Sequence, residues 1–443
     1  MANVLGTILA FTIVFGILVF VHEFGHFFMA KLVGVRVEVF SFGYGKRLFG
    51  VKKGETDYRI SLLPLGGYVK LLGEGMFEKD RPLAPDDLMA KTRGQRLLIM
   101  AMGSIMNIIL AVLIVAFMNV VGTEVAAYLD DKPVIGYIET SSPAEKAGLR
   151  IDDEIVRIGG REVKTWTEVE MAVGTKPDRL VRIDIRRDGE TLPVNLQTES
   201  VTRYQMGYAG FEAKILTQIK MVLSKSAAEK AGLRAGDIVL AIDGAPVYYN
   251  QFIGIIQKSP GEELLFSVRR GGQTLTIPVT PRKEGDAGKI GVSHGPASVT
   301  KKYAFFTAVG QSVKKNLSDT FLVIRFIKEL FTGEASTRQL GGPLEIANFS
   351  YTAFRLGWMP LLAWIAVISL QLGILNLFPI PVFDGGQIFV LIIESIFRRD
   401  LGPKSRQVWM SIGFVIFVVL IVFVVLNDIV KRLPNGWGSL APF

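Results

Sequence analysis

The chain opens with an uncharged segment that is too apolar to remain in water. Residues 2–21 contain no ionisable side chain, and the run continues directly into His22, Glu23 and His26. About 20 apolar residues in a helix span the hydrocarbon core of a bilayer, and ionisable groups at that depth mark a functional site by default. The segment therefore predicts a membrane-spanning helix that carries reactive side chains.

The spacing of the two histidines gives this helix a chemical interpretation. Residues i and i+4 lie on one face of a helix about one turn apart, so the imidazoles of His22 and His26 can bind one Zn²⁺. Glu23 then lies beside the metal, where a carboxylate acts as general base for a water that attacks a carbonyl. The alternative is a pair of histidines packed in a core helix, but the chain has only three histidines. The motif favours an intramembrane zinc protease.

Composition is typical of a membrane protein with a large soluble part. The 443 residues are 49% hydrophobic, yet 21% are charged, and the charges lie away from four long apolar runs. These runs predict spans at about 4–31, 97–121, 357–397 and 408–427. The net charge of +9 is explained by basic residues that flank the spans, so no nucleic-acid partner is expected. The chain has no cysteine, which excludes disulfides, thiolate ligands and a cysteine nucleophile.

The basic residues also predict an orientation. Lysines and arginines follow the first span closely and none precedes it, and the connection 398–407 is basic as well. Because basic loops stay in the cytoplasm, we expect 32–96 and 398–407 there, with both termini outside. The segment 122–356 is then extracytoplasmic. Lys431 and Arg432, which follow the last span, argue mildly against this orientation.

A catalytic zinc with two histidine ligands needs a third protein ligand. The third histidine, His294, falls in the extracytoplasmic segment, so we favour Asp384 in the sequence N-L-F-P-I-P-V-F-D-G-G at 376–386. Its prolines end a helix, its glycine pair allows a tight turn, and irregular backbone at membrane depth must be buried or line a cavity. The alternative is a proline kink with Asp384 at a helix cap. Asn376 is expected to hold substrate backbone or, alternatively, to bond a neighbouring helix.

Together these motifs resemble the site-2 protease family of intramembrane metalloproteases. The resemblance rests on H-E-F-G-H in a first span and N-x-x-P-x-P-x-x-D-G in a late one. It extends to G-G-Y-V-K at 66–70 and G-G-P-L-E-I-A at 341–347, and runs nearly end to end. It is strongest for the bacterial members with tandem PDZ domains between their second and third spans.

The resemblance implies that His22, His26 and Asp384 hold Zn²⁺ and that Glu23 is the general base. It implies substrates that are single-span membrane proteins already trimmed outside the membrane, such as an anti-sigma factor, and also remnant signal peptides. The implied location is a bacterial inner membrane, among lipid, with the active site toward the cytoplasm. Two other function classes stay open: a metal-binding transporter, whose broken helices also mark ion sites, and a catalytically inactive scaffold working through its PDZ domains.

Two positions depart from the family's pattern. Phe383, just before Asp384, stands where leucine is usual. Ser104 stands where the family commonly has proline, within the second-span motif G-S-I-M-N that ends at Asn107. Asn107 itself is kept, and like Asn376 it is expected to bind substrate.

The insert between the second and third spans repeats itself. The sequence A-E-K-A-G-L-R at 144–150 recurs 84 residues later at 228–234, and the alignment continues without a gap through the next apolar segment. A period of this length suits two copies of a small domain. The pattern A-x-x-A-G-L, followed by D-x-I and a glycine turn, resembles PDZ domains, which implies PDZ-like α+β domains at 123–205 and 206–283. PDZ folds bind peptides by adding a strand to a sheet edge; the alternative is a bulky cap that only limits access.

Residues 35–72 predict a membrane-associated β-hairpin, because apolar and polar residues alternate on either side of the turn-rich sequence 43–54. Its edge is expected to pair with an extended substrate; the alternative is a surface hairpin with no such role. In the linker 284–355, apolar residues recur mostly every three or four positions from Phe306 to Phe331. They predict an amphipathic helix on the outer membrane surface or packed on the PDZ-like domains.

The predicted fold class is thus a polytopic α-helical membrane protein with about four spans, a hairpin and two PDZ-like domains. Its membrane domain comprises 1–122 and 356–443 on either side of the insert.

Overall fold

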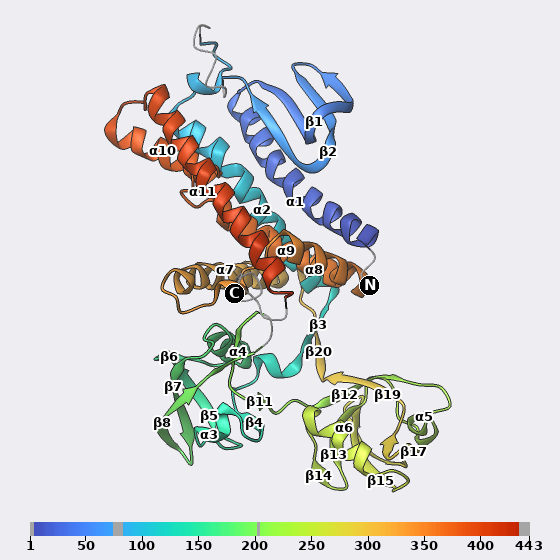
Figure 1. Cartoon of the computed structure of the whole chain (residues 1–443). Helices are drawn as coiled ribbons and strands as arrows, with labels where there is room; N and C mark the ends of the chain where they lie inside the picture. Colours follow the sequence, from blue (N-terminus) through green and yellow to red (C-terminus); the bar gives the residue numbers. More distant parts are fainter. Residues whose placement is uncertain (1–3, 74–82, 202–203, 434–443) are drawn as a thin grey trace. The chain divides into compact units, whose positions relative to one another are not determined.

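The computed structural model describes residues 4–73, 83–201 and 204–433 (Figure 1). These residues form two compact units, which are treated separately below. The helical unit comprises Met1–Gly122, Lys302–Lys328 and Leu340–Phe443. The sheet unit comprises Thr123–Lys301 and Glu329–Gln339.

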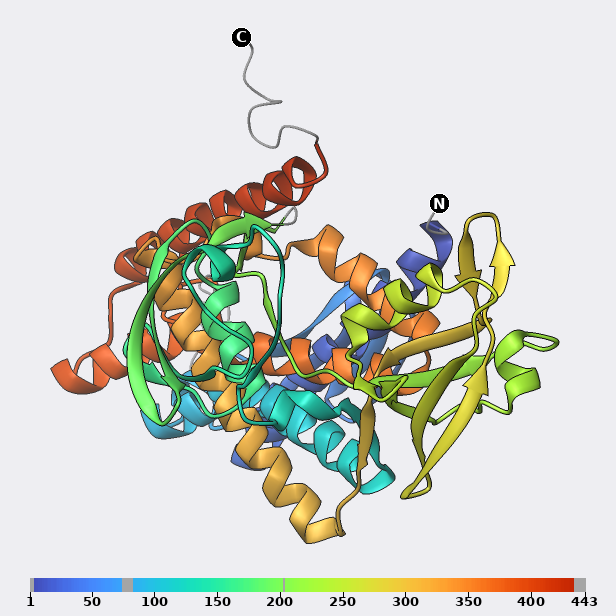
Figure 2. The same cartoon turned by 90° about the horizontal axis from the view of Figure 1, so that it is seen from below.

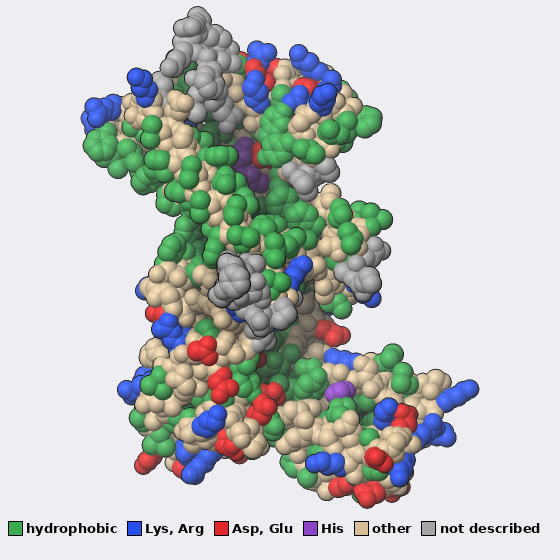
Figure 3. Space-filling model, in the orientation of Figure 1, with side chains coloured by type: hydrophobic (Ala, Val, Ile, Leu, Met, Phe, Trp, Pro, Cys, Tyr) green, Lys and Arg blue, Asp and Glu red, His purple; other side chains and the backbone are tan. Residues whose placement is uncertain are grey.

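Four helices among the described residues are long and apolar enough to cross a membrane, and all belong to the helical unit. They are α1 (Val4–Val33), α2 (Arg93–Val121), α9 (Trp358–Asn376) and α11 (Pro403–Val430). Large apolar side chains are exposed along them, and Figure 3 shows hydrophobic atoms over much of the visible face of this unit. An exposed apolar surface of this extent suits a lipid environment, as predicted for a polytopic membrane protein.

The third apolar run, predicted at 357–397, contains two helices. Helix α9 ends at Asn376, and a separate helix, α10 (Asp384–Phe397), follows it. Pro379 and Pro381 lie between them and cannot donate a backbone hydrogen bond, so neither helix continues across the gap. The predicted interruption of this run is confirmed.

Two further helices belong to the helical unit: α7 (Phe305–Phe331), up to Lys328, and α8 (Pro343–Leu356). Both views show α7 as one continuous helix (Figures 1 and 2). It contacts α2, because the hydroxyl of Ser312 donates to the Val112 carbonyl at 2.6 Å. Phe306, Leu317 and Phe321 on α7 remain exposed, as expected of an amphipathic helix.

The hairpin predicted at 35–72 is confirmed as β1 (Val37–Lys53) paired antiparallel with β2 (Thr56–Leu71). The prediction was wrong about 43–54: β1 continues through most of this sequence, and the chain reverses only at its end. Phe40 of β1 is paired with both Tyr58 and Val69 of β2. The last part of β2 therefore forms an outer edge of the hairpin.

One end of the helical unit gathers the hairpin, the start of α2 and the connection between α10 and α11. The Arg36 backbone N–H donates to the Asp86 carbonyl at 2.9 Å, a short 3₁₀ turn (Leu88–Ala90) leads into α2, and Arg93 pairs with Asp400 at 2.9 Å. Lys and Arg side chains cluster at this end (Figure 3). The two segments predicted to be cytoplasmic therefore meet at the same end of the unit.

The sheet unit contains two copies of one arrangement, as the sequence repeat predicts. The first copy has sheets of order β6-β5-β7-β8 and β11-β4; the second has one sheet of order β16-β15-β13-β12-β19, with β14 on β13. The helices and strands of the first copy are β4 (Ile135–Ile138), α3 (Pro143–Lys146), β5 (Glu154–Ile158), β6 (Arg161–Glu162), α4 (Trp166–Gly174), β7 (Leu180–Arg187), β8 (Glu190–Gln197), β9 (Glu199–Val201), β10 (Met206–Tyr208) and β11 (Phe211–Ala213). Those of the second are β12 (Thr217–Val222), α5 (Ala227–Ala231), β13 (Ile238–Ile242), β14 (Ala245–Pro246), α6 (Tyr249–Lys258), β15 (Leu264–Arg270), β16 (Gln273–Val279), β17 (Arg282–Glu284), β18 (Ala287–Lys289) and β19 (Val292–Pro296).

A buried ion pair recurs at matching positions of the two copies. Asp153 receives both the Nε and Nη2 protons of Arg187 at 2.7 Å, and Asp237 receives those of Arg270 at 2.6 Å. Both aspartates are buried and each also accepts a backbone N–H from the preceding turn. Two-point pairs of this kind hold the turn that carries the aspartate against the end of the strand that carries the arginine, which is β7 in the first copy and β15 in the second.

Each copy extends beyond the boundary predicted for it. Strand β11 pairs with β4, so the first copy includes residues past 205, and β19 pairs with β12, so the second includes residues past 283. Two strands then join the ends of the unit's long segment: β3 (Thr123–Ala126) pairs with β20 (Ser298–Lys301). The remaining elements are 3₁₀ turns at Ala127–Asp130 and Thr337–Gln339.

Candidate metal centre

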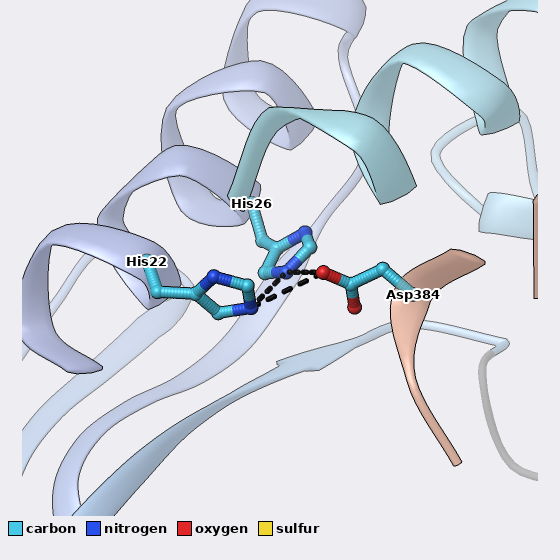
Figure 4. A group of neighbouring side chains, drawn as sticks. All are labelled: His22, His26 and Asp384. Atoms are coloured by element: carbon cyan, nitrogen blue, oxygen red, sulfur yellow. Dashed lines mark hydrogen bonds and ion pairs between the residues drawn. The ribbon is translucent and has the colours of Figure 1, made fainter. Parts of the chain in front are cut away.

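Helix α1 presents His22 and His26 from successive turns on one face. Their Nε2 atoms lie 3.2 Å apart, and both imidazoles point toward the carboxylate of Asp384 (Figure 4). Asp384 begins α10, and its Oδ2 atom lies 3.2 Å from Nε2 of His22 and 3.5 Å from Nε2 of His26. Among the described residues, these three form the cluster able to hold a metal ion.

The spacing of the three atoms fits zinc. Ligands at about 2.0–2.1 Å from a tetrahedral zinc are about 3.3 Å from one another, which lies within the range of the three separations. Two imidazole nitrogens and one carboxylate oxygen are also a usual ligand set for a catalytic zinc, which keeps its fourth position for water or substrate. The donor types and their distances therefore both match a catalytic zinc site.

Helix α2 contacts all three ligands from behind. The Ile99 carbonyl lies 2.8 Å from Nδ1 of His26, and the Asn107 amide lies 3.4 Å from Nδ1 of His22. The Ser104 hydroxyl donates to Oδ2 of Asp384 at 3.3 Å. A carbonyl acceptor at Nδ1 fixes the ring and the tautomer of His26, so that its Nε2 atom is free to bind a metal, while the Asn107 amide fixes the orientation of the His22 ring.

Glycines allow the helices to approach this closely. A Cβ on Gly103 would lie 2.3 Å from Nε2 of His26, and one on Gly25 would lie 2.4 Å from the Met102 carbonyl oxygen. The pair Gly385 and Gly386 packs in the same way against the loop between α9 and α10. Both glycines lie in the first turn of α10 and not in a separate tight turn. Glycine is required at these positions because the loop backbone leaves no space for a Cβ.

Glu23 lies between the ligand cluster and the hairpin. Its Oε2 atom accepts the backbone N–H of Val69 at 3.1 Å, and a Cβ on Gly67 would contact its Cγ at 3.4 Å. The G-G-Y-V-K motif therefore contributes the edge segment of β2 that runs past this carboxylate.

The remaining predicted residues are distributed as follows. Asn107 is fully buried and faces His22, and Asn376 is half-buried at the end of α9. His294 belongs to the sheet unit, where it lies on β19 against the rings of Tyr249 and Phe252 at 5.3 Å, and burial lowers its pKa. Sequence patterns did not predict the contacts of Ile99, Ser104 and Val69, although Ser104 was noted as a departure from the family.

Comparison with known proteins agrees with this geometry. The model of peptidase family M50 matches residues 10–420. A "Putative zinc metalloprotease" of Vibrio cholerae is 33% identical over 460 residues, covering 97% of this chain and all of that one. "Regulator of sigma-E protease RseP" of Escherichia coli is 30% identical over 465 residues, covering 97% of this chain and 99% of that one.

The match spans nearly the whole of both chains, so it includes the first helix, the insert and the late helices together. The chain therefore belongs to peptidase family M50, the site-2 proteases, and is a membrane-embedded zinc metalloprotease.

Proposed function

We propose that this protease cleaves peptide bonds within the transmembrane segments of single-span membrane proteins. The observation that carries the proposal is the position of the ligand cluster. His22 and His26 lie in the second half of α1, a helix that is apolar enough to cross a membrane, and Asp384 meets them from α10. A peptide bond that reaches this cluster is therefore bordered by the apolar part of the bilayer.

In the proposed reaction, His22, His26 and Asp384 hold zinc, which supplies Lewis-acid activation of water and of the scissile carbonyl. Glu23 accepts a proton from the attacking water and delivers it to the nitrogen of the leaving amine. The carbonyl carbon gains a bond to oxygen as its bond to nitrogen breaks, so water is the only co-reactant. Asn376, half-buried at the end of α9, is the proposed contact to substrate backbone.

The hairpin is proposed to bind the substrate in an extended form. The outer segment of β2 lies beside Glu23, because the Val69 N–H bonds to its carboxylate. A peptide added as a strand along this segment would run past the general base. Extension is needed because the peptide bonds of a helix are shielded by their own hydrogen bonds.

The relatives suggest the substrate class. One is named for regulation of sigma-E, which favours an anti-sigma factor type of membrane protein as a substrate here. Remnant signal peptides have the same single apolar span and are a second proposed class. The proposed location is a bacterial inner membrane, where the partner of the helical unit is lipid. Family membership and the complete ligand set favour a protease over the transporter and inactive-scaffold alternatives.

The proposed orientation has the hairpin end in the cytoplasm. The hairpin and the α10–α11 connection, both rich in exposed Lys and Arg, share that end. Lys431, which argued against this orientation, has no exposed side-chain surface and lies 3.6 Å from Asp428 and 3.9 Å from Glu345. A neutralised, buried lysine carries little weight in the positive-inside rule, so the active site is proposed to face the cytoplasm and the sheet unit the outside.

The two copies in the sheet unit are proposed to be PDZ-like domains. In each copy a glycine with positive φ, Gly210 or Gly291, directly precedes an outermost strand, β11 or β19. A strand in that position can accept a peptide as an added strand. Two roles are proposed for these domains: peptide binding, or restriction of access to the active site. If the domains bind peptide, an added peptide is expected to slow hydrogen exchange of β11 or β19; if they only restrict access, it is expected to have no effect.

The test uses purified protein in detergent, a model transmembrane peptide and a metal assay. The native protein is expected to contain zinc and to cleave the peptide. Glu23→Gln is expected to keep zinc and the fold but to lose about 10²–10⁴-fold in cleavage rate, because the amide cannot accept the proton. Turnover within tenfold of the native rate would exclude Glu23 as general base.

A further inference from the structure

One face of α2 contacts the three proposed metal ligands. Ile99, Gly103, Ser104 and Asn107 follow one another on a single side of a helix with 3.6 residues per turn. Each touches one of the three ligands: Ile99 and Gly103 meet His26, Asn107 meets His22, and Ser104 meets Asp384. The contact to the carboxylate differs in kind from the others, because it comes from a hydroxyl at a position where the family commonly has proline.

The environment of Ser104 favours this contact. The residue is fully buried in the middle of α2, where a serine hydroxyl ordinarily bonds to a carbonyl of its own preceding turn. Here the hydroxyl donates to Asp384 instead, at 3.3 Å, and to the oxygen that faces both imidazole nitrogens. Apart from the two imidazoles, Ser104 is the hydrogen-bond donor to the Asp384 carboxylate among the described residues.

We propose that Ser104 is a positioning residue that holds the Asp384 carboxylate in the orientation required of a metal ligand. The inference rests on the proposed ligand set His22, His26 and Asp384. Asp384 follows an irregular loop at the very start of α10, so its backbone is not fixed by a preceding helical turn. A hydroxyl from the rigid helix α2 supplies the orientation that this loop does not. A proline at position 104 could not do so, because it carries no donor.

Zinc affinity is the direct measure of this role. Ser104→Ala leaves all three ligands in place but removes the donor, and loss of an outer partner of a ligand typically weakens metal binding about 10–100-fold. Competition between the purified protein and a fluorescent zinc chelator measures that shift without any substrate. The absorption spectrum of the cobalt-substituted protein reports the ligand geometry independently, and it is expected to change in Ser104→Ala.

Three variants separate the possible outcomes. Ser104→Thr keeps the hydroxyl and is expected to restore most of the affinity. Ser312→Ala is the matched control, because it also removes a buried hydroxyl, one that bonds to the Val112 carbonyl of α2 and not to a metal ligand. This variant is expected to bind zinc like the native protein. Asp384→Ala is expected to lose zinc, and retention there would overturn the proposed ligand set itself.

Native zinc affinity and an unchanged cobalt spectrum in Ser104→Ala, with loss of zinc in Asp384→Ala, would overturn the role of Ser104 while leaving the ligand set intact. Equal losses in Ser104→Ala and Ser312→Ala would also overturn it, since they would indicate a general effect on α2 packing. If the extra methyl group of threonine cannot be accommodated, the cobalt spectrum of Ser104→Ala decides alone.

Discussion

At the scale of single residues, absent side chains matter as much as reactive ones. Gly103 has no Cβ, and this leaves room for the imidazole of His26, whose Nε2 would otherwise be 2.3 Å from it. Contacts that short do not occur, so any side chain at position 103 must displace the ring. The position of a metal ligand on α1 thus depends on a glycine of α2.

Gly103→Ala is therefore expected to reduce zinc content and to lower cleavage by at least about tenfold, in line with losses seen when ligand support is removed. Gly94→Ala is the control, because Gly94 lies in the same helix and has open space around it. Zinc per chain and peptide cleavage are measured on both variants. Full zinc content in Gly103→Ala would contradict the packing described here.

The sequence predicted some residue roles better than others. His22 and His26 follow from a four-residue spacing on one helix, which is local information. Asp384 follows from a polar residue in a broken apolar run. Asn107 was expected to bind substrate, but its amide lies against Nδ1 of His22, which makes support of that ligand its proposed role. Its contact depends on how α1 and α2 pack, and no local pattern encodes that register.

At the scale of elements, local patterns predicted the existence of helices and strands, whereas long-range pairing set their limits. The alternation in 35–72 predicted a hairpin, but not that β1 would run to Lys53, because glycines in an extended strand look like turn residues. The 84-residue repeat predicted two copies. The repeat did not reveal β11 and β19. Each is the last strand in the sequence of its copy and pairs with the first strand, β4 or β12, so its place depends on long-range pairing.

The buried pair of Asp237 and Arg270 gives a stability prediction for one element. Removing one partner of a buried pair costs about 3–5 kcal/mol. Asp237→Ala is therefore expected to destabilise the second copy and to speed hydrogen exchange in its strands by about a hundredfold to several thousandfold, at about 1.4 kcal/mol per factor of ten. Hydrogen exchange with mass spectrometry resolves the two copies, so the first copy is an internal standard.

Glu284→Ala is the matched variant, because Glu284 forms an exposed pair with Lys289 and such pairs contribute little. Its exchange rates are expected to match those of the native protein. Unchanged exchange in Asp237→Ala would mean that the repeated ion pair does not stabilise its copy.

At the scale of the whole molecule, the chemistry belongs to one unit and the insert to the other. All the residues proposed to hold zinc or move protons lie in the helical unit, and the long segment of the sheet unit, Thr123–Lys301, begins and ends at one place, where β3 pairs with β20. Residues 127–297 can therefore be replaced by the dipeptide Asn-Gly, which favours the two-residue turn of a β-hairpin and would join β3 directly to β20.

The shortened protein is expected to bind zinc and to cleave the model transmembrane peptide at a rate within about tenfold of the native one, since the general base is retained. It is also expected to accept substrates with larger outer domains if the insert restricts access. Cleavage of a graded series of substrates measures both. Complete loss of activity in a folded, zinc-loaded protein would instead show that the insert delivers substrate.

The zinc content of two variants tests the central claim most directly. After dialysis against a mild chelator, Asp384→Ala is expected to have lost its zinc, because two imidazoles alone do not complete a catalytic site. His294→Ala is expected to retain as much zinc as the native protein, because His294 packs on aromatic rings in the other unit. Retention of zinc by Asp384→Ala together with its loss from His294→Ala would contradict the site.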